Sequence, residues 1–243
     1  MKITILTLFP EMFTGFLETS IIARAQQQDK IQISCVNIRD YSDDKHRHVD
    51  DTPFGGGQGM VLQYQPLHQA LVAVRTAQSK VFLMAPTGQI FKQAMARKIA
   101  QNTELVLICG HYEGVDARIL DEIDGQLSIG DYVLTGGELA SMVVVDAVAR
   151  LVEGVITEDS HLDESFENGL LEYPQYTKPA ECNGKKVPEV LLSGHHENIR
   201  QYRLKESLRV TYENRPDLLD GRKLTVEEEQ FLREIKENKL KNE

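Results

Sequence analysis

Residues 104–118, ELVLICGHYEGVDAR, place a short apolar run directly before a loop with two glycines. The run Glu104–Cys109 has the length and side chains of a buried β-strand. Because the run ends at Gly110, the loop begins at the carboxyl end of the strand. Open α/β sheets bind ligands at this end of their strands, so the stretch predicts an α/β fold with a ligand site.

The same strand pattern recurs through the first 152 residues. We expect further strands over 2–8, 31–38, 80–85 and 126–129, and helices over 16–26, 66–77, 89–100 and 137–152. Strands that alternate with helices indicate a largely parallel sheet. The last of these helices contains ASMVVV (140–145), which is apolar nearly all round, so we expect it to be buried in a core or against another subunit.

The composition changes after residue 152. Residues 153–168 are rich in carboxylates and poor in apolar side chains, which predicts a flexible interdomain linker over 153–172. Helical periodicity returns after it, and the last amphipathic helix is expected over 224–240. The sequence therefore predicts a parallel-sheet domain over 1–152 and a small helical C-terminal domain over 173–243.

Several classes of protein are excluded by simple features of the chain. No apolar run reaches about 18 residues and the start lacks the pattern of a signal peptide, so we expect a cytoplasmic protein without a membrane segment. Cys35, Cys109 and Cys182 are isolated from one another. They predict neither a disulfide framework nor a zinc site, and we expect no metal.

The charge is unevenly distributed along the chain. The net charge of −10 argues against an RNA partner when taken alone, because phosphate contacts need lysine and arginine. Residues 110–172, however, contain 15 acidic and two basic side chains, so this acidic block carries −13 and the rest of the chain +3. A nucleic-acid surface can therefore lie outside the block, and a small cationic ligand inside it.

Two loops before residue 60 leave alternatives open. The stretch GGGQG (55–59) follows a charged loop and lacks the GxGxxG and Walker spacings, which excludes a Rossmann or P-loop site. A flexible connector explains it as well as a nucleotide-binding loop does. The stretch KHRH (45–48) suggests a metal or phosphate site, but the acids beside it lack an ordered ligand pattern, which favours a solvated or RNA-facing loop.

Three glycine-bearing segments each follow a predicted strand, at residues 85–88, 110–116 and 129–138. Each segment alone is compatible with an ordinary turn. Together they predict one ligand site at the carboxyl edge of the sheet, where glycine lets main-chain groups approach a flat heterocycle closely.

Six motifs occur in order along the chain. They are LFPEMF (8–13), DDTPFGGGQGMV (50–61), CGHYEGVDAR (109–118), SIGDYVLTGGEL (128–139), GLLEYPQYTKP (169–179) and VPEVLLSGHH (187–196). With these motifs the chain resembles the bacterial tRNA (guanine-N1)-methyltransferases, the TrmD family of the SPOUT superfamily, over essentially its whole length.

The resemblance implies a SPOUT-type trefoil knot in the N-terminal domain, which binds S-adenosylmethionine as methyl donor. It also implies a homodimer whose active sites share residues of both subunits. The implied cofactor residues are Leu83, Ala85, Pro86, Gly88, Gly110, Tyr112, Glu113, Ile129, Gly130, Asp131, Tyr132, Val133, Leu134, Gly136 and Gly137. A sulfonium cation suits the acidic block that contains most of them.

The implied reaction transfers a methyl group to N1 of guanosine-37, immediately 3′ of the anticodon in tRNA. Deprotonating N1 needs a general base, and a cation near O6 stabilises the developing charge. The resemblance assigns these roles to Glu164 and Arg150, with Asp163 as the rival base because the family has aspartate where this chain has Glu164. Glu153 and Ala140 replace prolines that are common in the family, a change that concerns loop rigidity.

RNA contacts are expected in the C-terminal domain. The resemblance places Tyr176 and Lys178 near the anticodon stem-loop. Arg200, Arg203, Lys205 and Arg209 lie on one predicted helix with only Glu206 among them, and Tyr202 is able to stack on a base, although a solvated helix face explains these charges equally well. Two alternatives stay open: a SPOUT methyltransferase acting on another RNA position, and a non-enzymatic RNA-binding protein.

Overall fold

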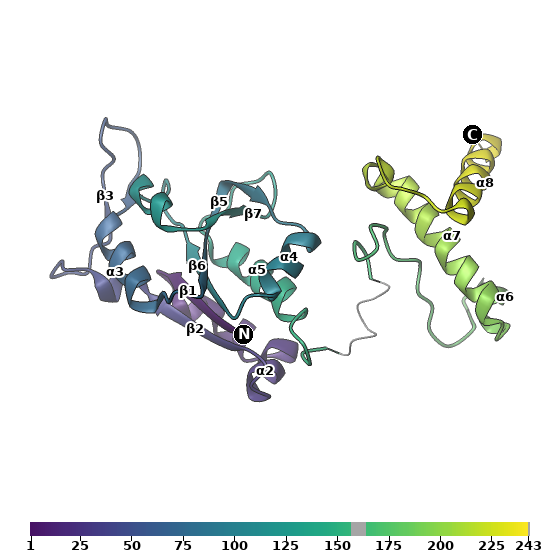
Figure 1. Ribbon diagram of the computed structural model, residues 1–243, viewed down its shortest axis with the longest axis horizontal. Helices are drawn as coiled ribbons and strands as arrows, with labels where there is room; N and C mark the ends of the chain where they lie inside the picture. Colours follow the sequence, from purple (N-terminus) through teal and green to yellow (C-terminus); the bar gives the residue numbers. More distant parts are fainter. Residues whose placement is uncertain (157–163, 243) are drawn as a thin grey trace. The chain divides into compact units, whose positions relative to one another are not determined.

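The computed structural model describes residues 1–156 and 164–242 (Figure 1). Contacts within the chain divide it into two compact units, Met1–Glu158 and Asp159–Glu243. The division falls inside the linker expected over 153–172, and residues 157–163 of that linker lie outside the described residues. No helix in the described part of the chain is long and apolar enough to cross a membrane.

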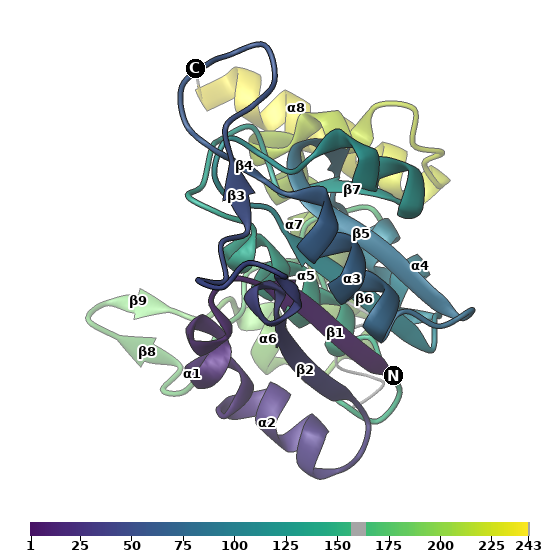
Figure 2. The same ribbon diagram turned by 90° about the vertical axis from the view of Figure 1, so that its left-hand side faces the viewer.

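The first unit is built on a five-stranded sheet in which all neighbouring strands are parallel (Figure 2). Its order is β2 (Gln32–Asn37), β1 (Lys2–Thr7), β6 (Glu104–Cys109), β5 (Ser79–Ile90) and β7 (Gly125–Ser128). The predicted α/β fold with a parallel sheet is confirmed. The order brings β6, β5 and β7 together, so their carboxyl ends share one edge of the sheet.

Two hydrophobic cores cover the two faces of this sheet, because successive side chains of a strand point to opposite faces. Ile5 and Leu107 belong to the core beneath α2 (Ser20–Gln27), α4 (Gln93–Ala100) and α5 (Glu138–Ala149). Leu6 and Ile108, the next residues along, belong to the core beneath α3 (Tyr64–Val74) and the short helices η2 (Ile38–Tyr41) and η3 (Ala117–Glu122). The unit is therefore a three-layer sandwich.

The first predicted helix is interrupted. The pattern over 16–26 predicts one helix, but the chain forms η1 (Pro10–Phe13), α1 (Thr14–Leu17) and then α2. Ser20 has a left-handed φ of 55°, and the Thr19 hydroxyl donates to the Gly15 carbonyl at 2.7 Å. This local bond to the backbone competes with helix continuation.

The segment 85–90 differs from its prediction as well. The expected helix over 89–100 begins only at Gln93, because β5 continues to Ile90 after a shift in its pairing with β7 between Met84 and Gln89. Residues 85–88 are therefore an irregular part of a strand and not a loop beyond its end. The sequence also did not predict the antiparallel pairing of β3 (Asp50–Asp51) with β4 (Val61–Leu62).

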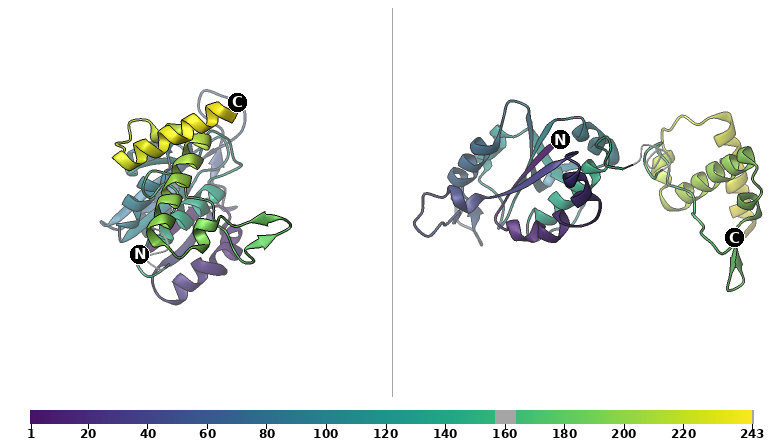
Figure 3. Two further views of the ribbon diagram at one scale, coloured as in Figure 1. Left: turned by 90° about the vertical axis from the view of Figure 1, so that its right-hand side faces the viewer. Right: turned by 90° about the horizontal axis from the view of Figure 1, so that it is seen from below.

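The second unit is mainly helical, as expected. Its longest elements are α7 (His196–Asn214) and α8 (Val226–Asn242), which pack against each other around Leu170, Leu208, Leu232 and Ile235 (Figure 3). The shorter elements are α6 (Glu189–Leu192), η5 (Pro216–Leu219) and the hairpin of β8 (Glu181–Cys182) and β9 (Lys185–Lys186), which projects from the unit. The knot in the first unit stays a prediction.

Candidate active site

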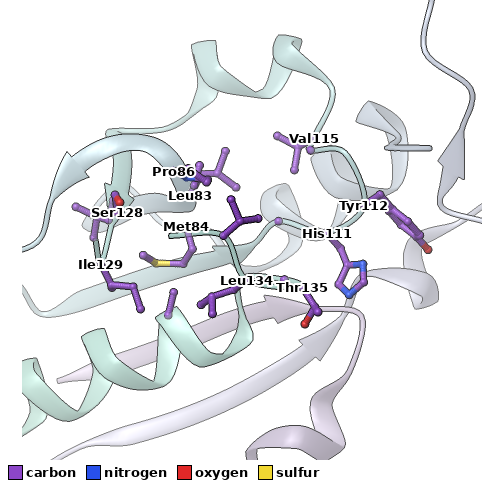
Figure 4. A pocket seen from close by; sticks show the side chains of 18 of the residues that line it. Leu83, Met84, Pro86, His111, Tyr112, Val115, Ser128, Ile129, Leu134 and Thr135 are labelled. Atoms are coloured by element: carbon purple, nitrogen blue, oxygen red, sulfur yellow. The ribbon is translucent and has the colours of Figure 1, made fainter. Parts of the chain in front are cut away.

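A cavity of about 260 Å³ lies where β5, β6 and β7 end (Figure 4). Its walls come from residues 83–86, 110–115 and 127–137, and Ala140 of α5 completes it. In Figure 4 the side chains of Met84, Ile129 and Leu134 gather over α5, and His111 lies beside Thr135 at the other end of the site. The three glycine-bearing segments thus meet in one place.

The cavity contains all but two of the cofactor residues expected from the sequence. The exceptions are Gly88 and Asp131. Its walls also include residues that the sequence reasoning missed: Met84, His111, Gly114, Val115, Leu127, Ser128, Thr135 and Ala140. His111, Gly114, Val115 and Thr135 lie inside the glycine-bearing segments 110–116 and 129–138, which the sequence did assign to the site as a whole. Met84, Leu127, Ser128 and Ala140 lie outside these segments, and no glycine pattern marks them.

Gly88 is required by the packing of the sheet and does not line the cavity. A Cβ atom at Gly88 would lie 2.5 Å from the backbone nitrogen of Leu127, a distance that real Cβ atoms do not show. Glycine is therefore required for the close approach of β5 to β7. This approach fixes the position of residues 127–130, which form one wall of the cavity.

The second and third loops are joined through their main chains. Gly137 N donates to Gly110 O at 2.8 Å, and His111 pairs with Gly136 in an isolated antiparallel bridge. A Cβ atom at Gly137 would lie 2.7 Å from the Cα of Cys109, so only glycine fits. Since α5 begins at Glu138, this junction sets where the helix starts against the end of β6.

The glycine stretch 55–59 leads into a segment that pairs with the site. Glu113 N donates to Met60 O, and Leu62 N donates to Gly114 O, each at 2.9 Å. Gly59, with a left-handed φ of 82°, lies so close to Glu113 that a Cβ atom there would meet its side chain at 2.5 Å. The residues that follow the stretch, Met60 and Leu62, therefore hold the loop 110–116 from outside, and within the stretch Gly59 lies against that loop.

The stretch 45–48 lies in an exposed loop whose charges are paired. Arg47 Nη1 lies 3.0 Å from Asp40 Oδ1, and His48 Nδ1 lies 2.8 Å from Asp44 Oδ1. Two backbone N–H groups, of His48 and His46, hold the pKa of Asp44 below its usual value. The carboxylate is thus used within the loop, and an RNA-facing role for this stretch stays a prediction.

The cavity contains few polar side-chain atoms. His111 Nδ1 is buried and has no hydrogen-bond partner among the described residues, while the imidazole ring packs against the rings of Phe9 and Tyr112. Burial raises the pKa of Tyr112, although a hydrogen bond from Arg39 opposes the shift. A neutral phenol, an unsatisfied imidazole nitrogen and main-chain groups suit an uncharged heterocycle.

Glu138 is a buried carboxylate beneath this cavity. It is 2% exposed, and Thr7 Oγ1 donates to its Oε1 at 2.8 Å. Glu138 is also the first residue of α5, where the helix dipole stabilises a negative charge. The first unit therefore places one compensated negative charge under the site.

The expected RNA-binding residues of the second unit fall into two groups. Tyr176, Lys178 and Arg203 line a separate cavity in that unit. Arg200, Lys205 and Arg209 instead form ion pairs with carboxylates: with Glu197 and Glu227, with Glu234, and with Glu206 and Glu213, respectively. The structure thus brings Tyr176, Lys178 and Arg203 together. It pairs Arg200, Lys205 and Arg209 with carboxylates of α7 or α8.

Comparison with known proteins matches this chain to one family. Residues 1–221 match the model of the family described as tRNA (guanine-1)-methyltransferase TrmD. The chain belongs to this family. Proteins of Streptococcus pneumoniae strains CGSP14, D39 and Hungary19A-6, each named tRNA (guanine-N(1)-)-methyltransferase, are 55% identical to it over 240 residues. These alignments cover 98% of this chain and 100% of each relative.

The predicted catalytic residues of this tRNA (guanine-1)-methyltransferase family member come from both units. Arg150 directly follows α5 in the first unit. Glu164 begins the described part of the second unit, in a turn where Glu167 N donates to its carbonyl oxygen at 3.2 Å. Asp163 lies outside the described residues. The catalytic roles of all three stay predictions.

Proposed function

We propose that this protein transfers a methyl group from S-adenosylmethionine to N1 of guanosine-37, 3′ of the anticodon in tRNA. One observation carries the proposal. The chain belongs to the tRNA (guanine-1)-methyltransferase family, and its three glycine-bearing segments enclose a single cavity at the carboxyl edge of a parallel sheet. This edge is where an open α/β sheet places its ligand.

The chemistry of the cavity lining supports binding of the methyl donor. Main-chain groups around Gly110 and over 129–134 are available to an adenine ring, and the unpartnered His111 Nδ1 offers one further hydrogen bond. Glu113 and the buried Glu138 give the site a negative surrounding for a cationic donor. When bound, S-adenosylmethionine supplies an electrophilic methyl group on its sulfonium.

The acceptor needs a base, because N1 of guanine carries a proton at neutral pH. In our proposal Glu164 accepts this proton, and the Arg150 guanidinium stabilises the negative charge that develops at O6. Asp163 is the rival base, since it supplies the aspartate that the family usually has at the neighbouring position. A carboxylate is retained under either assignment.

The two parts of the chain take separate tasks in this proposal. Residues 1–152 form the knotted domain that binds the methyl donor, and residues 173–243 bind the anticodon stem-loop. Of the linker expected over 153–172, the described residues 164–172 pack with the second unit, because Leu170 lies in its core and Leu171 N donates to Thr211 Oγ1. The cavity lined by Tyr176, Lys178 and Arg203 supports the RNA role of the second unit. We expect the protein to act in the cytoplasm, where tRNA is modified.

We further propose that the protein is a homodimer with shared active sites. Most apolar residues of α5 are used in the unit's own core, but Leu139 and Val143, one turn apart, are 50% and 46% exposed. A stable interface resembles a domain core cut in half, so an apolar strip of this kind suits a second copy. Sedimentation should give a species of twice 27.5 kDa, and Val143→Glu should reduce it to the monomer. A wild-type monomer at micromolar concentration would remove this part of the proposal.

The activity is tested by incubating the purified protein with methyl-labelled S-adenosylmethionine and an unmodified tRNA. Digestion to nucleosides should place the label on N1-methylguanosine from position 37. Label on a ribose 2′-oxygen would indicate the alternative SPOUT chemistry, and binding of tRNA without any transfer would indicate an RNA-binding protein.

A further inference from the structure

The second unit contains a cavity that the methyl-transfer chemistry does not use. Its volume is about 260 Å³, and it lies between the segment 173–178 and the helices α6 and α7. Its lining includes Tyr173, Tyr176, Lys178, Leu191, Ile199 and Arg203. Aromatic, aliphatic and cationic side chains therefore face the same small space, which we call the Arg203 cavity.

A stacked pair forms part of the wall of the Arg203 cavity. The guanidinium carbon of Arg203 lies 4.9 Å from the centre of the Tyr173 ring. Both residues also line a neighbouring cavity of about 300 Å³ along α7, so the pair stands between two openings. A flat guanidinium held on an aromatic ring presents a planar surface on which another ring is able to stack.

Arg203 differs from the neighbouring cations of α7 in how its charge is paired. The cations one turn before it and two positions after it, Arg200 and Lys205, are in ion pairs with carboxylates of α7 or α8. Among the described residues, none of the ion pairs involves Arg203. Its side chain is exposed, so its charge is available to an anionic ligand.

A second aromatic pair, Tyr176 and Tyr202, holds another part of the cavity lining in place. Tyr176 is 47% exposed, yet its hydroxyl forms a hydrogen bond with that of Tyr202 on α7. Burial, and then this bond, raise the pKa of Tyr202 to about 12. The Tyr176 ring is thus exposed to a ligand but anchored through its hydroxyl, which favours a fixed stacking surface over a mobile one.

We propose that the Arg203 cavity holds one unpaired nucleobase of the RNA substrate, stacked against the Arg203–Tyr173 pair, with Lys178 near the adjoining phosphate. The inference rests on the proposed function, from which it takes the RNA. Proteins recognise splayed single-stranded bases by stacking them on aromatic rings and arginine planes.

The test measures binding of the full chain to an anticodon stem-loop RNA by fluorescence anisotropy. Each loop nucleotide is replaced in turn by an abasic residue, and the proteins are wild type, Arg203→Ala, Arg203→Lys and Arg233→Ala. Arg203→Lys keeps the charge and removes the plane. Arg233→Ala is the control, because it removes an arginine that pairs with Glu229 on α8 and lines none of the described cavities. Far-UV circular dichroism and thermal unfolding check that the second unit of every variant is folded.

We expect Arg203→Ala and Arg203→Lys each to weaken binding of the intact RNA about tenfold, and Arg233→Ala to leave it unchanged. One abasic position should weaken wild-type binding by a similar factor and have no further effect on Arg203→Ala. Wild-type affinity in Arg203→Lys, or an abasic penalty that persists in Arg203→Ala, would overturn the proposal.

The result also separates this inference from the proposed function. Base-dependent binding without methyl transfer would leave the cavity assignment standing and refute the activity. Methylation of guanosine-37 by an enzyme whose RNA affinity does not depend on Arg203 would refute the cavity assignment alone.

Discussion

The two units present their candidate ligand surfaces in different ways. In the first unit main-chain contacts hold the walls of the cavity in place, where Gly137 donates to Gly110 and where Gly88 lets β5 approach β7. In the second unit it is made of side chains, and the chemistry depends on which cation is left without a carboxylate. Close packing of the main chain therefore shapes the first cavity, whereas the pairing of charged side chains decides which cation is available in the second.

This difference decides how much of each site could be predicted from sequence. A Cβ atom at Gly136 or Gly137 would lie within 2.7 Å of the residues 109–111, so glycine is needed at both positions, and the glycine pattern that marks the first site is visible along the chain. The ion-pair partners of Arg200 and Lys205 are Glu227 and Glu234, about 30 residues further on. Glu197, Glu206 and Glu213, which pair with Arg200 and Arg209, lie within four residues of them and were visible in the sequence. The pairs with Glu227 and Glu234 appear only when α7 packs on α8.

Some features of the first unit also could not be predicted locally. The strand β5 continues through 85–88 because it pairs again with β7, which is a tertiary contact. The joining of Met60 and Leu62 to the loop 110–116 likewise depends on the folded sheet. The strands themselves were predicted because their alternating apolar side chains fill two cores at once.

The largest effect should come from removal of the proposed general base. Glu164→Gln should lower the single-turnover methylation rate by about 100-fold to 10,000-fold, because the N1 proton then has no acceptor. S-adenosylmethionine should bind with unchanged affinity, since the donor cavity lies in the other unit.

The neighbouring carboxylate is the matched control for this variant. Asp163→Asn should have a much smaller effect on the same rate. The reverse ranking would assign the base to Asp163, and a loss below tenfold in both variants would refute a carboxylate mechanism in this segment.

A change in main-chain packing should affect only the first site. Gly137→Ala places a Cβ atom 2.7 Å from the Cα of Cys109, and overpacking of this kind costs about 1–3 kcal/mol of stability. We expect calorimetry to show S-adenosylmethionine binding weakened at least tenfold. Gly15→Ala, where a Cβ atom meets nothing within 4 Å, is the control and should bind normally. Equal affinities in the two variants would show that the loop junction does not shape the site.

The second unit should instead respond to pH through a buried carboxylate. Glu228 is 5% exposed; burial opposes its charge, but hydrogen bonds from Thr225 N–H and Arg222 hold its pKa below the usual value. A lowered pKa in the folded state gives stability that is present above the unfolded pKa of about 4.3 and is lost as pH falls through the folded value.

Glu228→Gln should therefore cost about 1–3 kcal/mol in urea unfolding at pH 7, because it weakens charge-assisted bonds at the start of α8. The difference from wild type should shrink in acid, below the folded pKa. A variant whose deficit grows as the pH falls would contradict this assignment.

The smallest effect should come from the paired cations of α7. Arg200→Ala removes an exposed ion-pair network, and exposed ion pairs contribute little to stability, so thermal unfolding should change little. Its tRNA affinity should fall less than twofold. If anisotropy showed the same loss for Arg200→Ala as for Arg203→Ala, the ion pairs would have to open on RNA binding, and the distinction between the two groups of cations would disappear.

Amide hydrogen exchange is the sharpest test of whether the three glycine-bearing segments form the S-adenosylmethionine site, because it reports the main chain of both units in one experiment. Addition of S-adenosylmethionine should slow exchange in residues 83–88, 110–116 and 128–137 and leave residues 173–178 and α7 unchanged. Addition of tRNA should then slow exchange in 173–178 as well. Protection by S-adenosylmethionine that falls outside the three glycine-bearing segments would contradict the account of this site.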